Sequence, residues 1–292
     1  MSDVGDVTGQ ARAESFTSGL SVSDFAACLA MGLEPVGLVQ GFCAMQSSNY
    51  AAGALQRNLS PYRETRGYVE NYQCPHGMVA GEHRMWGQNY EQYWVEQSWG
   101  QGFSSAYGRM LDEATRLGAI GVMGVVDTES TLVGAGVIEF HLRGTAVRLA
   151  GLNTSPSAPW TTYLAGQRLI KVFEAGFAPV SIIAAVSSVR VWAYCITEYL
   201  LGGGGMGAWS SNMSSLEIDQ VVRGQTESRA IVRASAKSQL HGDVLQGARL
   251  DVGQYEHEHG DLEIQSILRG NRVRRVRDFE QLRAPEPTVR LS

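Results

Sequence analysis

The chain of 292 residues carries two copies of one pattern, and this repeat constrains its fold more than any other feature. The stretch GLEPVGLVQG around Pro35 is matched by GFAPVSIIAA around Pro179. Further along, EFHLRGTAVRL from Glu139 is matched by QSILRGNRVRRV from Gln265. Because the matching pieces follow one another in the same order, we predict that the chain is built from two diverged copies of one folding unit.

Each copy has the same coarse plan: a short helix, a Gly-x-x-Pro turn, an apolar strand, a variable middle, a longer helix and two strands. In the first copy, apolar spacing predicts a helix over about 104–117, and the alternation in VIEFHLRG is typical of a strand with one solvated face. The second copy repeats this with a helix over about 228–240 and the strands DVLQGARLDV and LEIQSILRGNRVRRV. The predicted fold class is α+β, with two tandem pseudo-repeats, each a mostly antiparallel sheet packed by helices.

The repeat also predicts where the units begin and end. Small and polar residues at the N-terminus are typical of a flexible tail. The predicted organisation is a flexible N-terminal tail over 1–19, a first unit over 20–150, a linker over 151–163, a second unit over 164–276 and a C-terminal tail over 277–292.

One part of the repeat resembles a known family. The run ATRLGAIGVMGVVDT and the strand ending in RGTAVRL are similar to the YbjQ-like family of small bacterial proteins of unknown function, often labelled a heavy-metal-binding domain. Ile120 departs from the Asn or Asp that is usual in the family. Members are single-unit chains that assemble into rings, so the resemblance implies a tandem YbjQ-like chain in a ring-shaped homo-oligomer. The match is carried in the first copy by Gly118, Ala119, Gly124, Gly144, Thr145, Ala146 and Val147, and more weakly in the second by Asp243, Gly247 and Gly270.

The stretch YQCPHGMVAGEHRMWGQNYEQYW over 72–94 holds the strongest candidate metal ligands. Cys74, His76, Glu82 and His83 are residue types that bind zinc or another transition metal, and zinc needs four ligands. The alternative is a turn feeding a strand, since Pro75 restricts how its two neighbours can turn inward. A third reading makes Cys74 a nucleophile with His76 as its base, although residues two apart rarely reach that geometry.

Four further patterns were interpreted as structural. Trp86, Tyr90, Tyr93 and Trp94 have helical spacing, which is typical of a buried helix face or a subunit contact, with Trp99 following. GGGGMG over 202–207 lacks the strand and helix of a nucleotide fingerprint and is interpreted as a connection. YEHEHGD, with His257 and His259, is predicted at a hairpin tip, and the alternative is a metal held by the two imidazoles. The basic run RGNRVRRVR over 269–277 is predicted either to lie on an edge strand with its arginines facing water or to contact acids on a neighbouring chain.

Composition excludes several function classes. A formal net charge of -5 favours neither nucleic acid nor an anionic membrane as a partner. Four cysteines without CxxC spacing are typical of reduced thiols in the cytoplasm, and the apolar run AGFAPVSIIAAVSSV is too short to span a membrane. The leading hypothesis is a cytoplasmic, non-enzymatic protein that assembles into a homo-oligomer in a scaffold or binding role. The alternatives are a metal-binding or metal-sensing module, and a Cys-dependent enzyme.

Overall fold

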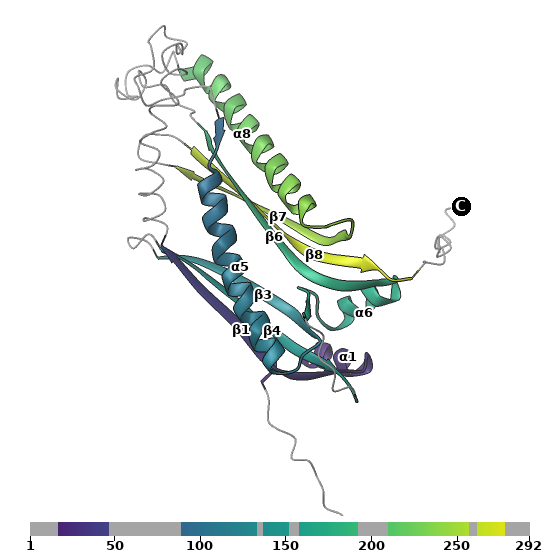
Figure 1. Ribbon diagram of the computed structural model, residues 1–292. Coiled ribbons are helices and arrows are strands. Elements are labelled where there is room, and N and C mark those ends of the chain that lie inside the picture. Colours follow the sequence, from purple (N-terminus) through teal and green to yellow (C-terminus); the bar gives the residue numbers. More distant parts are fainter. Residues whose placement is uncertain are drawn as a thin grey trace, which may run out of the picture.

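The computed structural model describes residues 17–46, 89–132, 137–151, 158–191, 210–256 and 262–277 of the chain. These ranges form two four-stranded sheets with helices between and around them (Figure 1).

The first unit begins with helix α1 (Val22–Ala30), which the side chain of Ser21 caps by accepting a hydrogen bond from the amide of Asp24. Strand β1 (Leu33–Gln46) follows, and after a long connection the chain forms β2 (Asn89–Glu91) and helix α5 (Tyr93–Arg116). Strands β3 (Gly121–Leu132) and β4 (Val137–Leu149) complete the unit. The first sheet has the order β1-β4-β3-β5, in which β5 (Trp160–Thr161) comes from the stretch before the second unit.

The second unit repeats this course. Helix α6 (Gly166–Glu174) precedes β6 (Phe177–Val191), then come helix α8 (Ser210–Ser238) and strands β7 (Val244–Glu256) and β8 (Leu262–Arg275). The second sheet has the order β2-β6-β8-β7.

The connectivity confirms the predicted α+β class with two tandem pseudo-repeats. In both sheets the last strand of the unit pairs antiparallel with the other two, as β4 does with β1 and β3, and β8 with β6 and β7. The irregularities match as well. The register shifts just after Pro35 and just after Pro179, and again at Gly124 and Gly247, whose φ angles are 61° and 64°.

Both units exchange a short strand. The two residues of β5 lie inside the stretch predicted as a linker, yet they pair in parallel with β3 of the first sheet. The three residues of β2 belong to the first unit in sequence, yet they pair with β6 of the second sheet. The chain therefore passes between the two sheets more than once.

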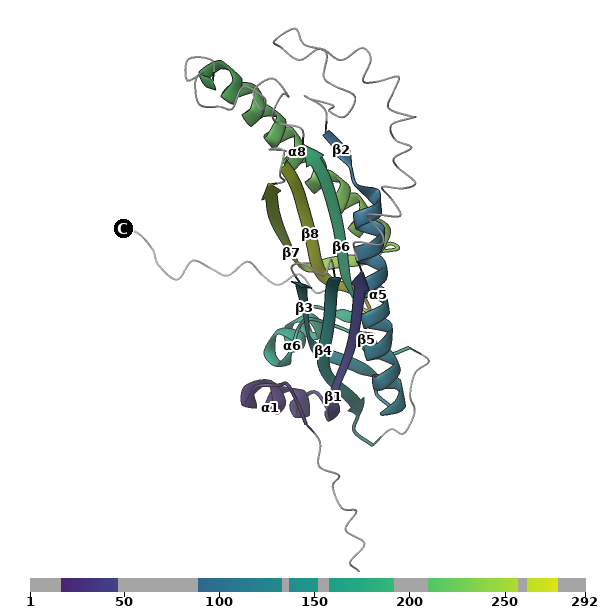
Figure 2. The same cartoon turned by 90° about the vertical axis from the view of Figure 1, so that its left-hand side faces the viewer.

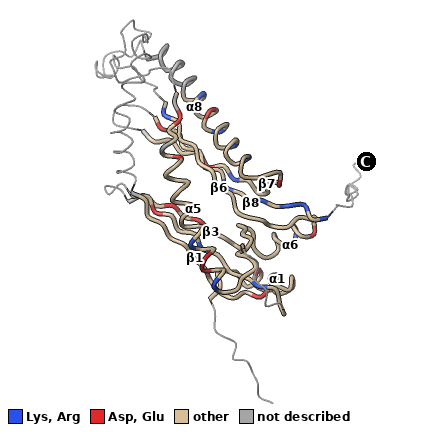
Figure 3. Tube along the Cα trace, in the orientation of Figure 1, with Lys and Arg blue, Asp and Glu red and all other residues tan. Residues whose placement is uncertain are grey.

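Three local expectations were wrong. Helix α5 extends well before 104, and α8 begins well before 228. The expected helical stripe does not form in its described part, because Tyr90 lies in β2 and α5 starts only at Tyr93, which is 59% exposed. The basic run lies near the end of β8, an interior strand and not an edge strand (Figure 3). Its Arg272 and Arg274 bind the carboxylate of Asp243, which their hydrogen bonds hold at a pKa of about 2.

The elements stack in layers, with α8 on the second sheet, α5 between the two sheets, and the first sheet beyond it (Figures 1 and 2). Helices α1 and α6 pack together at one end, where Cys28, Leu33 and Leu169 belong to one buried cluster. In the part of the chain that is described, none of the helices has the length and apolar character needed to cross a membrane.

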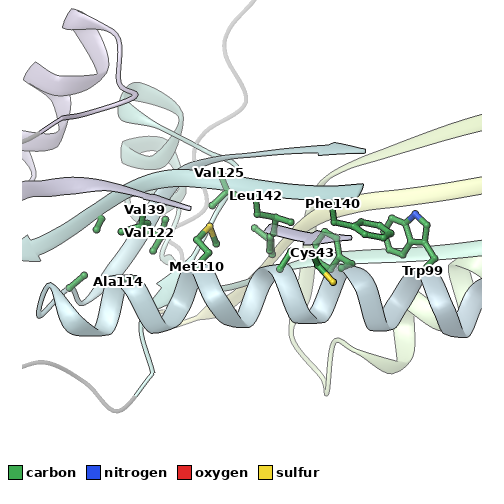
Figure 4. Packing of buried hydrophobic residues seen from close by; sticks show 14 of the residues in the cluster. Val39, Cys43, Trp99, Met110, Ala114, Val122, Val125, Phe140 and Leu142 are labelled. Atoms are coloured by element: carbon green, nitrogen blue, oxygen red, sulfur yellow. The ribbon is translucent and has the colours of Figure 1, made fainter. Parts of the chain in front are cut away.

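The main core lies where α5 meets the first sheet (Figure 4). Its helix side is made by Trp99, Phe103, Ala106, Met110 and Ala114, which recur every three or four residues as an amphipathic helix requires. Ile182 and Val186 of β6 join the same cluster, so α5 serves both sheets.

Close contact between α5 and β1 predicts that Gly41→Ala will destabilise the protein. A Cβ at position 41 would stand 1.8 Å from the backbone oxygen of Ala106, so the helix would have to move away. We expect a loss of about 2–3 kcal/mol or more. Gly108→Ala is the matched control, because nothing lies within 4 Å of its Cβ position and alanine favours helix; it should be neutral or stabilising by up to about 1 kcal/mol. Urea unfolding of both variants checks this, and equal stabilities would contradict it.

Candidate functional site

The contact between the two units, here called the unit junction, contains several buried polar interactions. Its centre is the segment 160–164, which runs between the first sheet and the second unit. Towards the first sheet, the amides of Gly124 and Val125 donate to the carbonyl oxygens of Leu164 and Thr162, at 2.9 and 3.0 Å. In return the Thr162 amide donates to the Val122 carbonyl at 3.0 Å. The segment is therefore held as an added strand along the outer edge of β3.

Towards the second unit, the same segment is held by side chains. The Asn271 Oδ1 accepts from the Thr162 hydroxyl at 2.9 Å and from the Tyr163 amide at 2.8 Å. The hydroxyl of Thr161 accepts from the Ile182 amide at 2.8 Å and lies 2.8 Å from the Tyr107 hydroxyl of α5. Thr161 and Thr162 are fully buried, so each of these bonds would be costly to break.

Beside this segment lies a partly buried ion cluster. Arg269 of β8 hydrogen-bonds the carboxylate of Asp127 on β3, which belongs to the other unit. Its guanidinium also lies 3.9 Å from Glu129 and 3.5 Å from Asp251. The Arg269 and Asp127 side chains are only 18% and 11% exposed. Opposite charges thus cross the junction in a poorly solvated position, where they fix how the units are aligned.

Trp99 links this cluster to the core. Its Nε1–H donates to Glu129 at 2.9 Å, while its ring stacks on Phe103 and meets Phe140 edge-on. Burial raises the pKa of the Glu129 carboxyl, and the Trp99 hydrogen bond and the Arg269 charge oppose that rise. Helix α5 therefore supplies both apolar packing and a donor to the junction.

The start of α5 binds the outer edge of β6. The Gln92 amide donates to the Ser188 carbonyl at 2.7 Å, and the Ser188 amide donates to Glu96 at 3.0 Å. Burial raises the pKa of Glu96 to about 7, and the neighbouring Glu91 adds to the rise while the Ser188 bond opposes it.

The raised pKa of Glu96 predicts a pH-dependent stability. The folded protein holds the Glu96 proton more tightly than the unfolded chain does. The stability that this gives is therefore fully present below about pH 4.5 and is lost as pH rises through about 7. Glu96→Gln removes the charge and keeps an acceptor for Ser188. We expect the variant to gain on the order of 1 kcal/mol over the parent above pH 7, a figure reduced for solvent screening of a half-exposed carboxyl, and nothing at pH 4. Denaturant unfolding across pH checks this; a gain that is equal at both ends would contradict it.

The outer face of the first sheet carries a hollow of about 770 Å³ near the edge of β1. Its ionisable side chains are already engaged: His141 Nε2 lies 3.3 Å from Gln40 Oε1, and the Ser130 hydroxyl donates to Glu139 at 3.0 Å. The Glu113 carboxylate accepts a hydrogen bond from the exposed backbone amide of Gln40. Among the residues that line this hollow, no hydroxyl is paired with the imidazole as a nucleophile and base would be.

The predicted metal ligands Cys74, His76, Glu82 and His83 lie outside the described residues, as do Trp86, GGGGMG, His257 and His259. That metal site therefore stays a prediction. Within the described ranges, no three His, Cys, Asp or Glu side chains are grouped to hold a metal ion. Cys28 and Cys43 are buried free thiols, and burial raises the pKa of Cys28 to about 11.

Sequence reasoning did not single out the junction. In the sequence, Arg269 is only a member of the repeated Leu-Arg-Gly, and Asp127 is only a member of a predicted strand. An available signal was the difference between the copies: the first has Thr145 where the second has Asn271, the residue that binds the segment 160–164.

The fold and junction define a class of protein: a tandem chain of two α+β units held together by an added strand and a partly buried ion cluster. No family model matches the chain. It is similar to the encapsulin nanocompartment protein Rv1762c of Mycobacterium tuberculosis (strain ATCC 25618 / H37Rv), with 25% identity over 241 residues, covering 80% of this chain and 76% of that protein.

Proposed function

We propose that this chain is a non-enzymatic protein that assembles with copies of itself and acts as a structural component. The observation that carries the proposal is the exposure of large apolar side chains on both sheets. Phe42 and Val126 are 48% and 45% exposed on the first sheet, and Val244 and Tyr255 are 48% and 53% exposed on β7. Large apolar side chains that are exposed on the strands of both sheets favour burial against another protein surface.

The similarity to an encapsulin nanocompartment protein supports an assembling role, because it extends over four fifths of the chain. On that basis we infer that the chain works within such a compartment or a comparable homo-oligomer. The hollow on the first sheet supports the non-enzymatic part, since its Ser130 and His141 are bound to other partners.

Three further expectations belong to this proposal. The two units are YbjQ-like, and a ring is the form of assembly that this resemblance implies. The protein acts in the cytoplasm, which its cysteine spacing favours. Nucleic acid is not a partner, because the net charge is -5.

Metal binding through Cys74, His76, Glu82 and His83 is the second candidate, and it rests on the sequence pattern alone. It competes with the first proposal only if metal is needed for the function. The two can be separated in one measurement.

Native mass spectrometry of the purified full-length chain tests both candidates, since it reports subunit number and bound metal together. We expect a defined homo-oligomer without stoichiometric metal. A monomer at micromolar concentration would refute the assembly proposal. Metal that is stoichiometric in the parent and absent from the Cys74→Ser, His76→Ala variant would favour the metal-binding function.

A further inference from the structure

The unit junction joins two different surfaces. The first unit contributes the outer edge of β3 at its bulge, and the second contributes the segment 160–164 and the face of its sheet that points away from α8. Since the units are copies, the second unit has its own counterpart of the β3 edge, and the first has its own counterpart of the segment and face. No described residue covers either counterpart in the way that the junction covers the originals.

The counterpart of the β3 edge is the outer edge of β7. The two strands have the same bulge, with Gly124 and Gly247 in the same left-handed conformation. On β3 the amides of Gly124 and Val125 are taken by the added segment. On β7 the same positions are Gly247 and Ala248, which are exposed and have no register partner on β8. β7 is the last strand of its sheet, so this edge resembles an acceptor without its added strand.

The counterpart of the segment 160–164 lies before α1. The stretch FTSGLS over 16–21 aligns with WTTYLA over 160–165 at the same spacing that relates Pro35 to Pro179. Both stretches directly precede the first helix of their unit. The described part, 17–20, is therefore the first unit's copy of the segment that joins the two units.

The hydrogen bonds of this segment repeat those of its copy. In the second unit the Leu164 amide donates to the Thr162 hydroxyl at 3.1 Å, and Thr162 and Tyr163 bind Asn271.

In the first unit the Leu20 amide donates to the Ser18 hydroxyl at 3.2 Å. Ser18 and the Gly19 amide contact the Thr145 hydroxyl, at 3.4 and 3.1 Å. Thr145 occupies on β4 the position that Asn271 has on β8. The segment 17–20 is thus fixed on its own unit by the same kind of hydrogen bonds that fix the segment 160–164 on the second unit. No described strand pairs with the outer side of the segment 17–20.

The sheet faces show the same contrast. In the second unit Ile182 and Val186 are packed under α5 and are only 6% and 5% exposed. Their counterparts on β1 are Leu38, which is half-buried, and Phe42, which is 48% exposed. A surface buried in one copy of the unit is therefore open in the other.

We propose that copies of this chain join head to tail, with the segment 17–20 of one copy adding in parallel to the outer edge of β7 of the next. This inference rests on the proposed function and specifies its interface. By analogy with the junction, the Ser18 amide binds the Leu245 carbonyl, and the amides of Ala248 and Gly247 bind the carbonyls of Ser18 and Leu20. Such an interface is heterologous, so it builds a ring when the rotation closes and a filament when it does not.

One feature of the junction is not repeated in this interface. Arg143 stands on β4 where Arg269 stands on β8, but β7 has Leu250 at the place of Asp127. The contact between copies therefore lacks this ion pair and depends on backbone bonds and apolar contacts. Because Arg143 has no counter-charge at this place, Arg143→Ala should not weaken assembly, which makes it a useful control.

Substitution of Ser18 tests the backbone part of the proposal. Ser18→Pro removes the amide that would bind Leu245, whereas Ser18→Ala keeps that amide and removes only the hydroxyl. We expect native mass spectrometry to show Ser18→Pro shifted to smaller species. Ser18→Ala should be shifted much less, because it loses only the hydroxyl that holds the segment. Arg143→Ala should assemble at least as fully as the parent. Circular dichroism shows whether the proline variant keeps its fold.

Cross-linking tests the position directly and does not depend on the proline variant. Thr17→Cys and Val244→Cys are made in separate chains, co-expressed, and treated with a short bismaleimide, so a linked pair can form only between chains. We expect a covalent dimer above the background that the parent and each single variant give. An oligomeric parent without this link, and with Ser18→Pro unchanged, would overturn head-to-tail joining and leave the proposed function standing. A monomeric parent would overturn both.

Discussion

Arg269→Met is expected to destabilise the protein by about 2–4 kcal/mol, because it leaves two partly buried carboxylates without their counter-charge. Asp127 and Glu129 are 11% and 22% exposed, so water replaces little of the lost interaction. Methionine fills much of the volume of the arginine stem, and the loss therefore reports charge more than packing. The measurement is urea unfolding, from which both the midpoint and the m-value are compared with those of the parent.

Arg249→Met is the matched control on the neighbouring strand. Its guanidinium pairs with Asp251 at 3.0 Å, but the Arg249 side chain is 76% exposed, so we expect a loss below about 1 kcal/mol. Asp127→Leu combined with Arg269→Met should recover part of the stability, since Leu250 already occupies the equivalent place in the second unit. If Arg269→Met costs no more than Arg249→Met, the cluster does not hold the units together.

Much of the fold could be predicted because the same sequence pattern occurs in both units. Pro35 and Pro179 mark the same bulge in two first strands, and the repeated Leu-Arg-Gly marks the same place in two last strands. Alternation along 137–149 correctly separates buried Phe140 and Leu142 from the solvated side of β4. Periodicity of this kind reports which face is buried, whichever strands lie beside it.

The exchanged strands could not be predicted in the same way. β2 and β5 contain three and two residues, too few to show any period. Their partners lie in the other unit, so local sequence carries no information about the pairing. The aromatic spacing over 86–94 suggested a helix, but Tyr90 pairs with β6 through its backbone, and tertiary contact decided the structure there.

The candidate site shows the same limit in its charges. Arg143 and Arg269 occupy equivalent places and have the same alternation, which predicts a solvated side chain for both. Arg143 is exposed, whereas the Arg269 side chain is only 18% exposed because the first unit covers that face of the second sheet. Only the arrangement of the two units distinguishes them. Cys74, His76, Glu82 and His83 lie outside the described residues, so the sequence remains the basis for that prediction.

Trp99→Ala is expected to cost about 3–5 kcal/mol, because one side chain supports two kinds of interaction. The indole is 2% exposed, stacks on Phe103 with ring centroids 5.3 Å apart, and meets Phe140 edge-on at 5.5 Å. Its removal leaves a cavity between α5 and the first sheet. It also takes away the donor that binds Glu129.

Trp99→Phe separates these two contributions. Phenylalanine keeps an apolar ring but has no N–H, so we expect a smaller loss of about 1–3 kcal/mol. Tyr93→Ala in the same helix, with its ring 59% exposed, is the control and should cost less than about 1 kcal/mol.

The dependence on pH identifies the role of the hydrogen bond. Since the Trp99 N–H lowers a Glu129 pKa that burial has raised, its loss raises that pKa further. A carboxyl with a raised pKa in the folded state lowers the free energy of unfolding when it ionises. The free energy of unfolding of Trp99→Phe should therefore fall further below that of the parent as pH rises from about 4.5 towards 8. Urea unfolding at both pH values measures the deficit. A deficit that is independent of pH would show that the indole acts through packing alone and that its bond to Glu129 adds nothing to the stability of the junction.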